Sequence, residues 1–305
     1  TFRAMIFGLI REGKTPPDRR AVLNPAQCAH LIAQGHQVVV EPSPIRCYPD
    51  ADYNAVGCAL SSDLSTCDVL LGVKEVPIAE LHEGATQFFF SHTYKEQPYN
   101  RALLKACLQK NVRLIDWELL KQNGQRVIGF GLYAGLVGAY EAIRGFALQE
   151  GQPPLPAAVE LGWVADLKAQ LNDHPKGSWK VVLTGKGRVG QGAKEMLLAG
   201  GFQAVSPEDF VTHPAGNRPV FTVLDTKHYV ARNDGQPYDK ADFYAHPEAY
   251  KSSFFPYACA ADVYIPCHYW AENSPSFFSA AEAQDPAFSL KFIGDISCDI
   301  AGPIP

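Results

Sequence analysis

The chain has 305 residues, of which 47% are hydrophobic and 19% are charged. This length suggests about two domains, each large enough to bury a core of its own. The formal net charge is −5, and no basic blocks occur, which argues against the positive surface that nucleic-acid binding needs. The longest uncharged stretch near mid-chain, residues 127–140, is shorter than the roughly 20 apolar residues of a membrane helix.

Cysteine and histidine spacing indicates no metal site. The chain has eight cysteines and nine histidines, without a CxxC pair or another spacing typical of metal ligands. The N-terminus reads as a short strand, residues 3–10, followed by charge, and not as a signal peptide. We therefore expect reduced thiols and a cytoplasmic protein without a metal.

Strand-like and helix-like segments alternate through the first half. Strands are expected at residues 3–10, 37–41, 69–73, 87–91, 112–115 and 126–128. One helix is expected from Asn24-Pro25 to Gly35, because asparagine caps a helix and proline suits its first position. A second helix is expected from about residue 98 to residue 110. This alternation predicts a mostly parallel sheet that is covered on both faces.

The second half contains a glycine fingerprint, Gly-Lys-Gly-Arg-Val-Gly, at residues 185–190. It stands between an apolar run, residues 179–184, and a helical stretch, residues 191–199. In this strand–turn–helix context the GxGxxG pattern is typical of dinucleotide binding, because backbone N–H groups at the helix start hold the pyrophosphate. The candidate cofactor-binding residues are Gly185, Gly187, Arg188, Val189 and Gly190.

An acidic residue that holds the ribose hydroxyls usually ends the strand after this fingerprint. Residues 207–219 resemble an insertion, and residues 220–225 then read as a strand that ends in Asp225, with Glu208 and Asp209 as alternatives. An acid here favours NAD over NADP, because it repels a 2′-phosphate. Further strands are expected at residues 262–268 and 292–295, and the charged segment 238–251 is expected to interrupt the sheet.

A long helix is expected over residues 134–149, with glycines that let another backbone approach closely. The stretch that follows, residues 150–156 (Glu-Gly-Gln-Pro-Pro-Leu-Pro), has the composition of a linker. We therefore expect a catalytic, substrate-binding domain at 1–150 and an NAD-binding domain at 151–305. Both are predicted to be α/β and Rossmann-like, with mostly parallel sheets and a cleft between them.

Polar residues follow the strands of the first half, where parallel sheets bind ligands. They are Arg11 and Glu12, Lys74 and Glu75, His92, and Asp116 and Glu118. A lysine, a histidine and carboxylates on one edge form a workable set for proton transfer. Each residue also has a structural interpretation, as a solvated loop residue, a hydrogen-bonded histidine or the start of a helix.

Several segments resemble the superfamily of alanine dehydrogenase, transhydrogenase and saccharopine dehydrogenase (NAD, L-lysine-forming). These segments are residues 19–25, 72–77, 90–97, 114–119, 129–135 and 295–299. The His-x-Tyr-Lys pattern at residues 92–95 and the Phe-Gly-x-Tyr-Ala-Gly pattern at 130–135 are more similar to saccharopine dehydrogenases than to alanine dehydrogenases. Family members continue for several tens of residues beyond the position of Pro305, so we expect their returning C-terminal segment to be absent.

The resemblance implies an NAD-dependent oxidoreductase that acts on the CH–NH bond of an amino acid or opine. Saccharopine dehydrogenase, which converts saccharopine to lysine and 2-oxoglutarate, is the first expectation; alanine dehydrogenase or a non-catalytic NAD-binding module is the alternative. The implied partner is a small-molecule substrate, with no nucleic acid or membrane, and a homo-oligomer is compatible with this class. The implied roles are substrate-carboxylate binding for Arg20, acid/base catalysis for Lys74 and His92, control of their charge for Glu75 and Glu118, and cofactor binding for Asp295.

Overall fold

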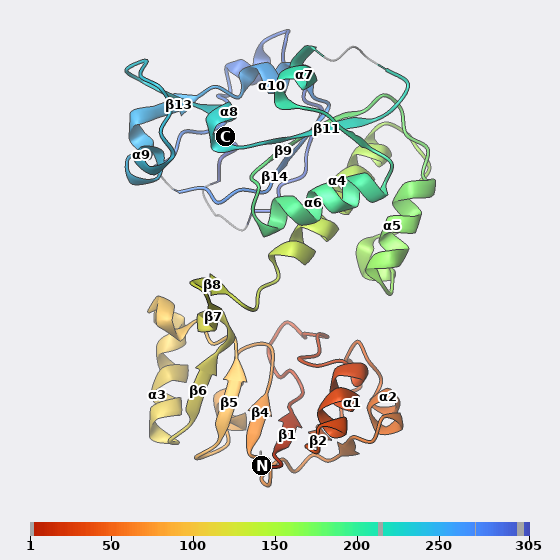
Figure 1. Ribbon diagram of the computed structural model, residues 1–305, viewed down its shortest axis with the longest axis vertical. Coiled ribbons are helices and arrows are strands. Elements are labelled where there is room, and N and C mark those ends of the chain that lie inside the picture. The colour runs from red at the N-terminus through yellow and green to blue at the C-terminus, as the bar shows by residue number, and fades with distance from the viewer. Residues whose placement is uncertain (1–2, 213–215, 272, 298–301) are drawn as a thin grey trace. The chain divides into compact units, whose positions relative to one another are not determined.

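The computed structural model describes residues 3–212, 216–271, 273–297 and 302–305. The chain divides into two compact units, residues 1–129 and residues 130–305 (Figure 1). Each unit is built on a parallel β-sheet with helices on its faces. The predicted α/β class with mostly parallel sheets is therefore confirmed, and the cleft expected between the domains stays a prediction.

Six parallel strands form the main sheet of the first unit. They are β1 (Ile6–Leu9), β2 (Gln37–Val40), β3 (Ala59–Leu60), β4 (Val69–Leu71), β5 (Thr86–Phe89) and β6 (Arg113–Asp116). Their order, β3-β2-β1-β4-β5-β6, is that of the dinucleotide-binding fold. The Rossmann-like prediction for this unit is confirmed, although β3 was not expected.

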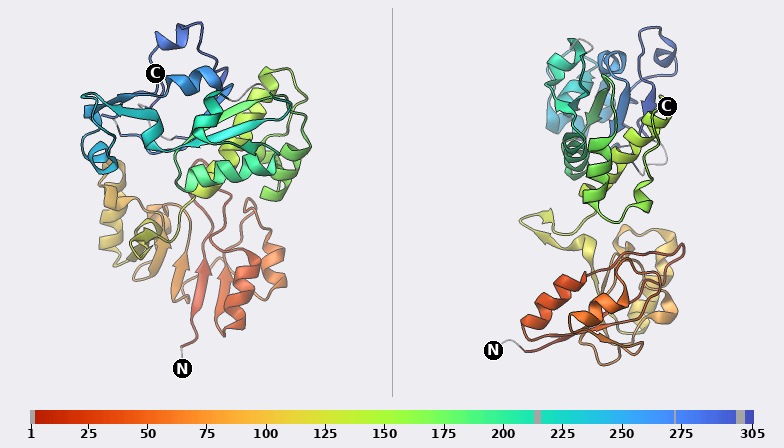
Figure 2. Two further views of the ribbon diagram at one scale, coloured as in Figure 1. Left: turned by 45° about the horizontal axis from the view of Figure 1, so that its top comes forward. Right: turned by 90° about the vertical axis from the view of Figure 1, so that its right-hand side faces the viewer.

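Helices cover both faces of this sheet (Figures 1 and 2). α1 (Pro25–Ala33) and α2 (Asp50–Ala55) pack on one face, and α3 (Arg101–Gln109) packs on the other. Because side chains alternate along a strand, Leu9 lies in the cluster with α1 and Phe89 lies in the cluster with α3. α1 starts as predicted, since Asn24 and Gln27 exchange hydrogen bonds between side chain and backbone in a capping box.

The expectation of a sheet strand at residues 126–128 is wrong. The structure places β8 (Gln125–Arg126) in a two-stranded antiparallel hairpin with β7 (Lys121–Gln122). Asn123 and Gly124 connect the two strands, and both have a positive φ. Two-residue hairpin turns of this kind favour Asn-Gly, because glycine and asparagine tolerate left-handed backbone. This dipeptide was the sequence signal for the hairpin.

The second unit contains a five-stranded parallel sheet in the order β10-β11-β9-β14-β15. The strands are β9 (Lys180–Thr184), β10 (Gln203–Ala204), β11 (Val220–Leu224), β14 (Val263–Pro266) and β15 (Phe292–Ile293). β11 lies beside β9, where the second strand of a dinucleotide-binding fold belongs. The interpretation of residues 220–225 as that strand is therefore confirmed, and the short β10 is an unexpected edge strand.

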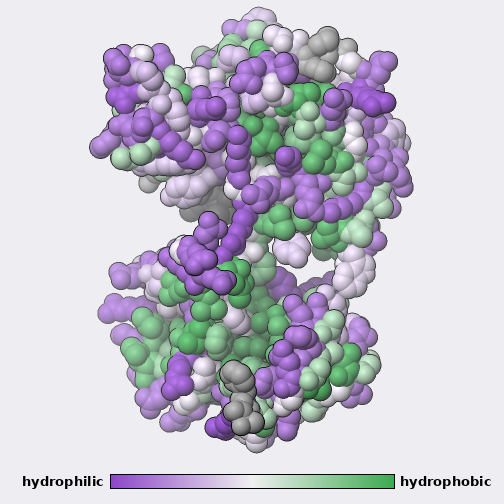
Figure 3. Space-filling view, viewed as in Figure 1, coloured by the Kyte–Doolittle hydropathy of each residue, from purple (hydrophilic) through white to green (hydrophobic). Residues whose placement is uncertain are grey.

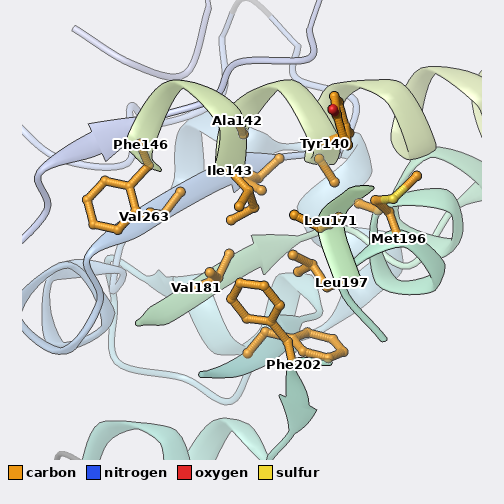
Figure 4. Close-up of a cluster of buried hydrophobic side chains, with 14 of the residues drawn as sticks. Tyr140, Ala142, Ile143, Phe146, Leu171, Val181, Met196, Leu197, Phe202 and Val263 are labelled. Atoms are coloured by element: carbon orange, nitrogen blue, oxygen red, sulfur yellow. The ribbon is translucent and has the colours of Figure 1, made fainter. Parts of the chain in front are cut away.

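Two apolar clusters lie on the two faces of this sheet. On one face pack α4 (Gly131–Gln149), α5 (Val164–Asp173) and α6 (Arg188–Ala199). Figure 4 shows this cluster, with Ile143 of α4 and Leu197 of α6 close to Val181 of β9. On the other face pack α7 (Pro207–Thr212), α8 (Thr226–Tyr229) and α10 (Phe255–Ala260).

Glycines bring α4 and α6 into backbone contact, as the glycine content of α4 predicted. A Cβ atom on Gly135 would lie 1.9 Å from the carbonyl oxygen of Val189, and one on Gly192 would lie 2.0 Å from that of Leu132. Side chains larger than hydrogen have no room at either position. α4 therefore packs directly against the helix that begins at the glycine fingerprint.

The compact units divide at Gly129, ahead of the boundary at residue 150 that composition suggested. The linker-like stretch after α4 is bound to that helix: Tyr140 Oη donates to the carbonyl of Pro156 at 2.8 Å, and Arg144 Nε donates to that of Leu155 at 3.0 Å. α4 itself belongs to the apolar cluster of the second unit. Proline and glycine content thus marked an ordered connection inside a unit.

The charged segment expected to interrupt the second sheet lies outside it. β12 (Val230–Arg232) and β13 (Tyr250–Ser252) form an antiparallel ribbon, and α9 (Lys240–Ala245) lies between them in sequence. The remaining elements are the short 3₁₀ helices η1 (Ile78–Glu80), η2 (Thr93–Lys95), η3 (Pro98–Asn100), η4 (Trp117–Leu119), η5 (Ala158–Glu160), η6 (Pro247–Ala249) and η7 (Glu282–Gln284).

None of the helices in the described part of the chain is both long enough and apolar enough to cross a membrane. Hydrophilic and hydrophobic residues are interspersed over the face of the molecule drawn in Figure 3.

Candidate functional site

Polar side chains gather beyond the carboxyl ends of β1, β4, β5 and β6, four adjacent parallel strands. Parallel strands end at a common edge, which is where such sheets bind ligands. The residues are Glu12 after β1, Lys74 and Glu75 after β4, His92 after β5, and Asp116 and Glu118 at the end of β6. Their predicted placement on one edge is confirmed, and their catalytic roles stay predictions.

Asp116 holds His92 in a strained backbone conformation. His92 has a φ of 54°, in the left-handed region that residues other than glycine rarely adopt. Asp116 Oδ2 accepts hydrogen bonds from the backbone N–H groups of Ser91 and His92, at 3.0 and 3.1 Å, and from the Ser91 hydroxyl at 2.6 Å. A carboxylate at the end of β6 thus fixes the turn that orients the imidazole after β5.

Glu75 connects His92 to Lys14. Its Oε1 lies 2.8 Å from His92 Nδ1, and its Oε2 accepts a hydrogen bond from Lys14 Nζ at 2.6 Å. Burial raises the pKa of Glu75, but the hydrogen bonds from Lys14 and His92 outweigh burial, so that the pKa lies below its usual value of 4.5. Glu75 is therefore an anion that orients the ring through Nδ1 and leaves Nε2 for chemistry.

Glu118 faces the other nitrogen of the same ring. Its side chain is 9% exposed, and its Oε1 pairs with Arg126 at 3.0 Å and with Lys95 at 3.4 Å. Its Oε2 lies 4.0 Å from His92 Nε2 and has no hydrogen-bond partner among the described residues. His92 thus lies between two carboxylates, and the gap at Nε2 is one that a water molecule or a reacting group can bridge.

Glu12 fixes the turn that carries Lys74. Its two carboxylate oxygens accept hydrogen bonds from the backbone N–H groups of Val73 and Lys74, at 2.7 and 2.8 Å. Burial raises the pKa of Glu12, against the lowering effect of these two hydrogen bonds. The half-buried Lys74 is therefore placed on the same edge as His92 by a side chain from the end of β1.

Arg20 is paired with Asp18. Arg20 Nε donates to both carboxylate oxygens of Asp18, at 3.0 and 3.1 Å. The hydrogen bonds from Arg20 lower the pKa of Asp18, and the charge of Lys74 acts in the same direction. The charges of Arg20 and Lys74 thus both act on Asp18. A substrate carboxylate would compete with Asp18 for the guanidinium group of Arg20.

The sequence did not single out four charged residues of this edge: Lys14, Asp18, Lys95 and Arg126. Two of them had a signal, since Asp18 precedes Arg20 and Lys95 belongs to the His-x-Tyr-Lys pattern. Lys14 follows the first strand by five residues, and Arg126 lies on the unexpected hairpin. Their contacts depend on loop conformations that periodicity does not reveal.

The glycine fingerprint of the second unit forms a tight turn between β9 and α6. Gly185 has a φ of 95°, and a Cβ atom there would lie 2.9 Å from backbone atoms of Cys267 and His268. A Cβ atom on Gly190 would lie 2.0 Å from the carbonyl oxygen of Gly185. A Cβ atom on Gly187, in contrast, would meet no atom of the described residues within 4 Å. The open space at Gly187, which caps α6, fits the approach of a pyrophosphate to the backbone.

Asp225 ends β11 and caps α8. Its Oδ1 accepts a hydrogen bond from the backbone N–H of Thr226 at 2.9 Å, and its Oδ2 lies 3.8 Å from Lys186 Nζ. Burial raises the pKa of Asp225, but the Thr226 hydrogen bond and the charges of Lys186 and Lys240 outweigh it and lower the pKa. The residue is an anion beside the glycine turn, as a ribose-binding acid requires.

A cavity of about 390 Å³ joins the glycine turn to Asp225. Its wall includes Gly185, Gly187 and Asp225, with His268 and Trp270 beyond β14. The alternative acids, Glu208 and Asp209, lie on α7 and do not line it. Of the three candidates for the ribose acid, Asp225 has the position that the prediction needs.

The other predicted cofactor residues lie near this cavity without lining it. Arg188 is exposed at the first position of α6, and Val189 packs against the apolar cluster under α4. Asp295 follows β15, accepts a hydrogen bond from the backbone N–H of Ser297, and acts electrostatically on Cys267 and His268. Of the segment 295–299, residues 298 and 299 lie outside the described residues.

Residues 8–137 match the family model "Alanine dehydrogenase/PNT, N-terminal domain". The predicted resemblance to this superfamily is confirmed. The match covers the strands and loops of the first unit that carry the charged edge, and it ends within α4.

Curated relatives of the superfamily match over almost the whole chain. The alpha-aminoadipic semialdehyde synthase of Arabidopsis thaliana is 32% identical over 98% of this chain and 32% of its own length. The saccharopine dehydrogenase [NAD(+), L-lysine-forming] of Neurospora crassa is 26% identical over 94% of this chain and 72% of its own length. The chain thus spans about a third of the first relative.

The solved structure of an L-alanine dehydrogenase has the same fold. It is 18% identical, with a TM-score of 0.53, and the match covers 92% of this chain and 70% of that chain. The match supports the Rossmann-like architecture of this chain.

Proposed function

We propose that the chain is an NAD-dependent dehydrogenase that acts on the CH–NH bond of an amino acid or opine, with saccharopine as the substrate. The observation that carries this proposal is the placement of His92 between Glu75 and Glu118, on the strand edge that also presents Lys74. Binding a dinucleotide requires none of these groups. Proton transfer requires a donor and an acceptor that are held in place, and this edge supplies both.

The second unit fits a dinucleotide. The open space at Gly187, the start of α6 and the anion at Asp225 would hold the pyrophosphate and the adenosine ribose. We take NAD as the cofactor, because Asp225 suits free ribose hydroxyls. When bound, the nicotinamide supplies the hydride acceptor.

The first unit supplies proton transfer and substrate recognition. Oxidation at carbon leaves an imine, to which water adds, and the resulting carbinolamine collapses to an amine and a ketone. In these reaction steps, His92 and Lys74 move the protons, and Glu75 holds His92 through Nδ1. Arg20 binds a substrate carboxylate in place of Asp18, because a guanidinium group matches a carboxylate with two parallel hydrogen bonds.

The proposed function extends to the roles of the two units. The unit of residues 1–129 is the catalytic and substrate-binding part, and the unit of residues 130–305 is the NAD-binding part. Support comes from the charged edge in the first unit and the glycine turn in the second. The names of the relatives that match both units, saccharopine dehydrogenase among them, favour saccharopine over alanine as the substrate.

The test is NADH oxidation followed at 340 nm, with lysine plus 2-oxoglutarate in one reaction and pyruvate plus ammonia in the other. Turnover with the first pair, and little with the second, is the expected result. Turnover with pyruvate and ammonia alone would identify an alanine dehydrogenase. NADH binding without turnover of either pair would identify a cofactor-binding module and contradict the proposal.

A further inference from the structure

Two residues that line the cavity beyond β14, His268 and Trp270, each have a buried ring nitrogen without a hydrogen-bond partner among the described residues. The two atoms are His268 Nε2 and Trp270 Nε1. Neither atom is accessible to solvent, so bulk water does not satisfy it. Buried polar groups in native proteins nearly always have a partner. Because His268 and Trp270 both line the same cavity, a ligand bound there can supply a hydrogen-bond partner to both ring nitrogens.

A short relay decides which nitrogen of His268 bears the proton. Nδ1 lies 2.8 Å from Thr184 Oγ1, which in turn lies 3.0 Å from the Tyr264 hydroxyl. Thr184 and Tyr264 are fully buried, and no other described residue accepts from that hydroxyl. Tyr264 therefore donates to Thr184, and Thr184 donates to Nδ1. The proton of the neutral ring is then on Nε2.

The imidazole is neutral in the physiological range. Burial lowers the pKa of His268 to about 4, against the opposing effect of the Asp295 carboxylate. The rings of Tyr229 and Phe277 flank it, with centroids at 5.8 and 4.8 Å. Nε2–H of this ring and the indole N–H of Trp270 are thus both donors, and both need an acceptor.

The order of the strands shows which part of a dinucleotide reaches these donors. Asp225 ends β11 and His268 follows β14, and β9 with its glycine turn lies between these two strands. With the adenosine ribose at Asp225 and the pyrophosphate at the turn, the other half of the molecule extends toward β14. Beyond the pyrophosphate, that half offers oxygen acceptors in its ribose and its amide.

We propose that His268 and Trp270 form a two-donor subsite for an oxygen atom of the nicotinamide-riboside half of the cofactor. Thr184 and Tyr264 are positioning residues, because they act by fixing the tautomer of His268. This inference rests on the proposed dinucleotide function of the cavity. It adds a recognition element outside the glycine fingerprint and opposite the ribose acid.

The first test measures the affinity of the full chain for NADH and for ADP, which lacks the nicotinamide riboside. His268→Leu should raise the Kd for NADH about tenfold, which is the effect of losing one hydrogen bond, and leave that for ADP unchanged. His268→Gln returns an N–H donor and should recover part of the affinity. Equal weakening of NADH and ADP, or no weakening of either, overturns the subsite.

His174→Leu is the matched control. His174 also lies in the second unit, with Nε2 at 2.8 Å from the carbonyl oxygen of Pro153. Its Nδ1 is buried and has no hydrogen-bond partner in the part of the chain that the structure describes. His174 does not line the cavity, so its replacement should lower stability without changing the Kd for NADH. A wild-type chain that binds no NADH would refute the proposed function itself, whereas normal NADH binding by His268→Leu would refute the subsite alone.

A second test does not depend on affinity or activity. Nitrogen-15 NMR of the histidine rings should show His268 as the neutral Nε2–H tautomer at neutral pH, with a shift of Nε2 when NADH is added. Thr184→Val should mix the two tautomers, and Thr184→Ser should preserve the wild-type form. A wild-type Nδ1–H tautomer, or an Nε2 signal that NADH leaves unmoved, overturns the proposal.

Discussion

Gly190 packs against the carbonyl group of Gly185 so closely that a Cβ atom on Gly190 would lie 2.0 Å from that oxygen. Gly187, within the same fingerprint, has a negative φ of −72° and free space around its Cβ position. Gly190 is thus needed to close the turn, and Gly187 leaves the surface at the start of α6 open. Substitutions at these two positions should therefore have different effects, on folding at Gly190 and on dinucleotide binding at Gly187.

Gly187→Ala should fold with a melting temperature close to that of the wild type, because its Cβ meets no atom within 4 Å among the residues that the structure describes. The added methyl group occupies the space where a pyrophosphate approaches α6, so the Kd for NADH should rise at least tenfold. Gly190→Ala should instead destabilise the chain by about 3 kcal/mol, because overpacking against backbone has no simple relief. Calorimetry of unfolding and of NADH binding measures both effects. Unchanged NADH affinity in Gly187→Ala would contradict the position of the phosphate.

Lys74→Met and His92→Ala should each lower kcat by about a hundredfold or more, the range for losing a general acid or base. NADH affinity should stay unchanged, because the dinucleotide residues lie on the second unit. Steady-state kinetics and fluorescence titration with NADH measure the two quantities. Lys105→Met, on an exposed position of α3, is the control. Wild-type turnover in both variants would remove the acid/base assignment.

Asp225→Asn should weaken NADH binding by roughly ten- to a hundredfold, because a charged acceptor for the ribose hydroxyls is lost. The amide oxygen can still cap α8, so the melting temperature should change little. Asp209→Asn alters the rival acid on α7, which exchanges hydrogen bonds with Ser206 just before that helix, and should leave the affinity unchanged. The reverse pattern in a binding titration would transfer the ribose role to Asp209.

Acid stability should depend on Glu75. Its pKa is lowered in the folded state, so its contribution to stability is complete above its usual value of 4.5 and is lost as pH falls through the lower folded value. Glu75→Gln cannot titrate, and its free energy of unfolding should therefore decline less steeply than that of the wild type below pH 4.5. Urea unfolding at a series of pH values tests this. If the free energy of unfolding of the wild type and of Glu75→Gln declined in parallel, the charge of Glu75 would not contribute to stability.

Gly135→Ala should destabilise the chain by roughly 3 kcal/mol, because the new Cβ would overlap the carbonyl oxygen of Val189 on α6. Gly162→Ala is the matched control, since the nearest atom to its Cβ, an Asp166 oxygen, is 3.6 Å away. Thermal unfolding of the two variants gives the comparison. A small effect at Gly135 would mean that α4 and α6 can separate without cost.

The edge of the first sheet was predictable because parallel strands end together, so residues far apart in sequence, such as Lys74 and His92, could be grouped from strand order alone. Asp225 was predicted for a different reason, because an acid usually ends the strand after the glycine fingerprint, once residues 207–219 are set aside. Its position at the end of β11 is confirmed, and its role at the ribose stays a prediction. The contacts of Glu118 with Arg126 and Lys95 were not predicted. Residues 126–128 read as a sheet strand in spite of the Asn-Gly signal, and the left-handed turn at His92 has no signal in the periodicity.

The domain boundary could not be located from composition alone. Proline and glycine at residues 150–156 suggested a flexible linker, but Arg144 and Tyr140 hydrogen-bond to its backbone. The composition of a segment indicates how flexible it would be in isolation. It does not indicate which side chains of a neighbouring helix donate hydrogen bonds to the backbone of that segment.

The packing of α4 decides where the chain can be cut. A truncated protein that starts at residue 151 would lack Leu136, Ile143 and Phe146, each at most 2% exposed, and would leave their partners on α6 open to water. Such a piece should aggregate on expression, even though it contains every predicted cofactor residue. A cut before Phe130 keeps this helix with the sheet that it covers.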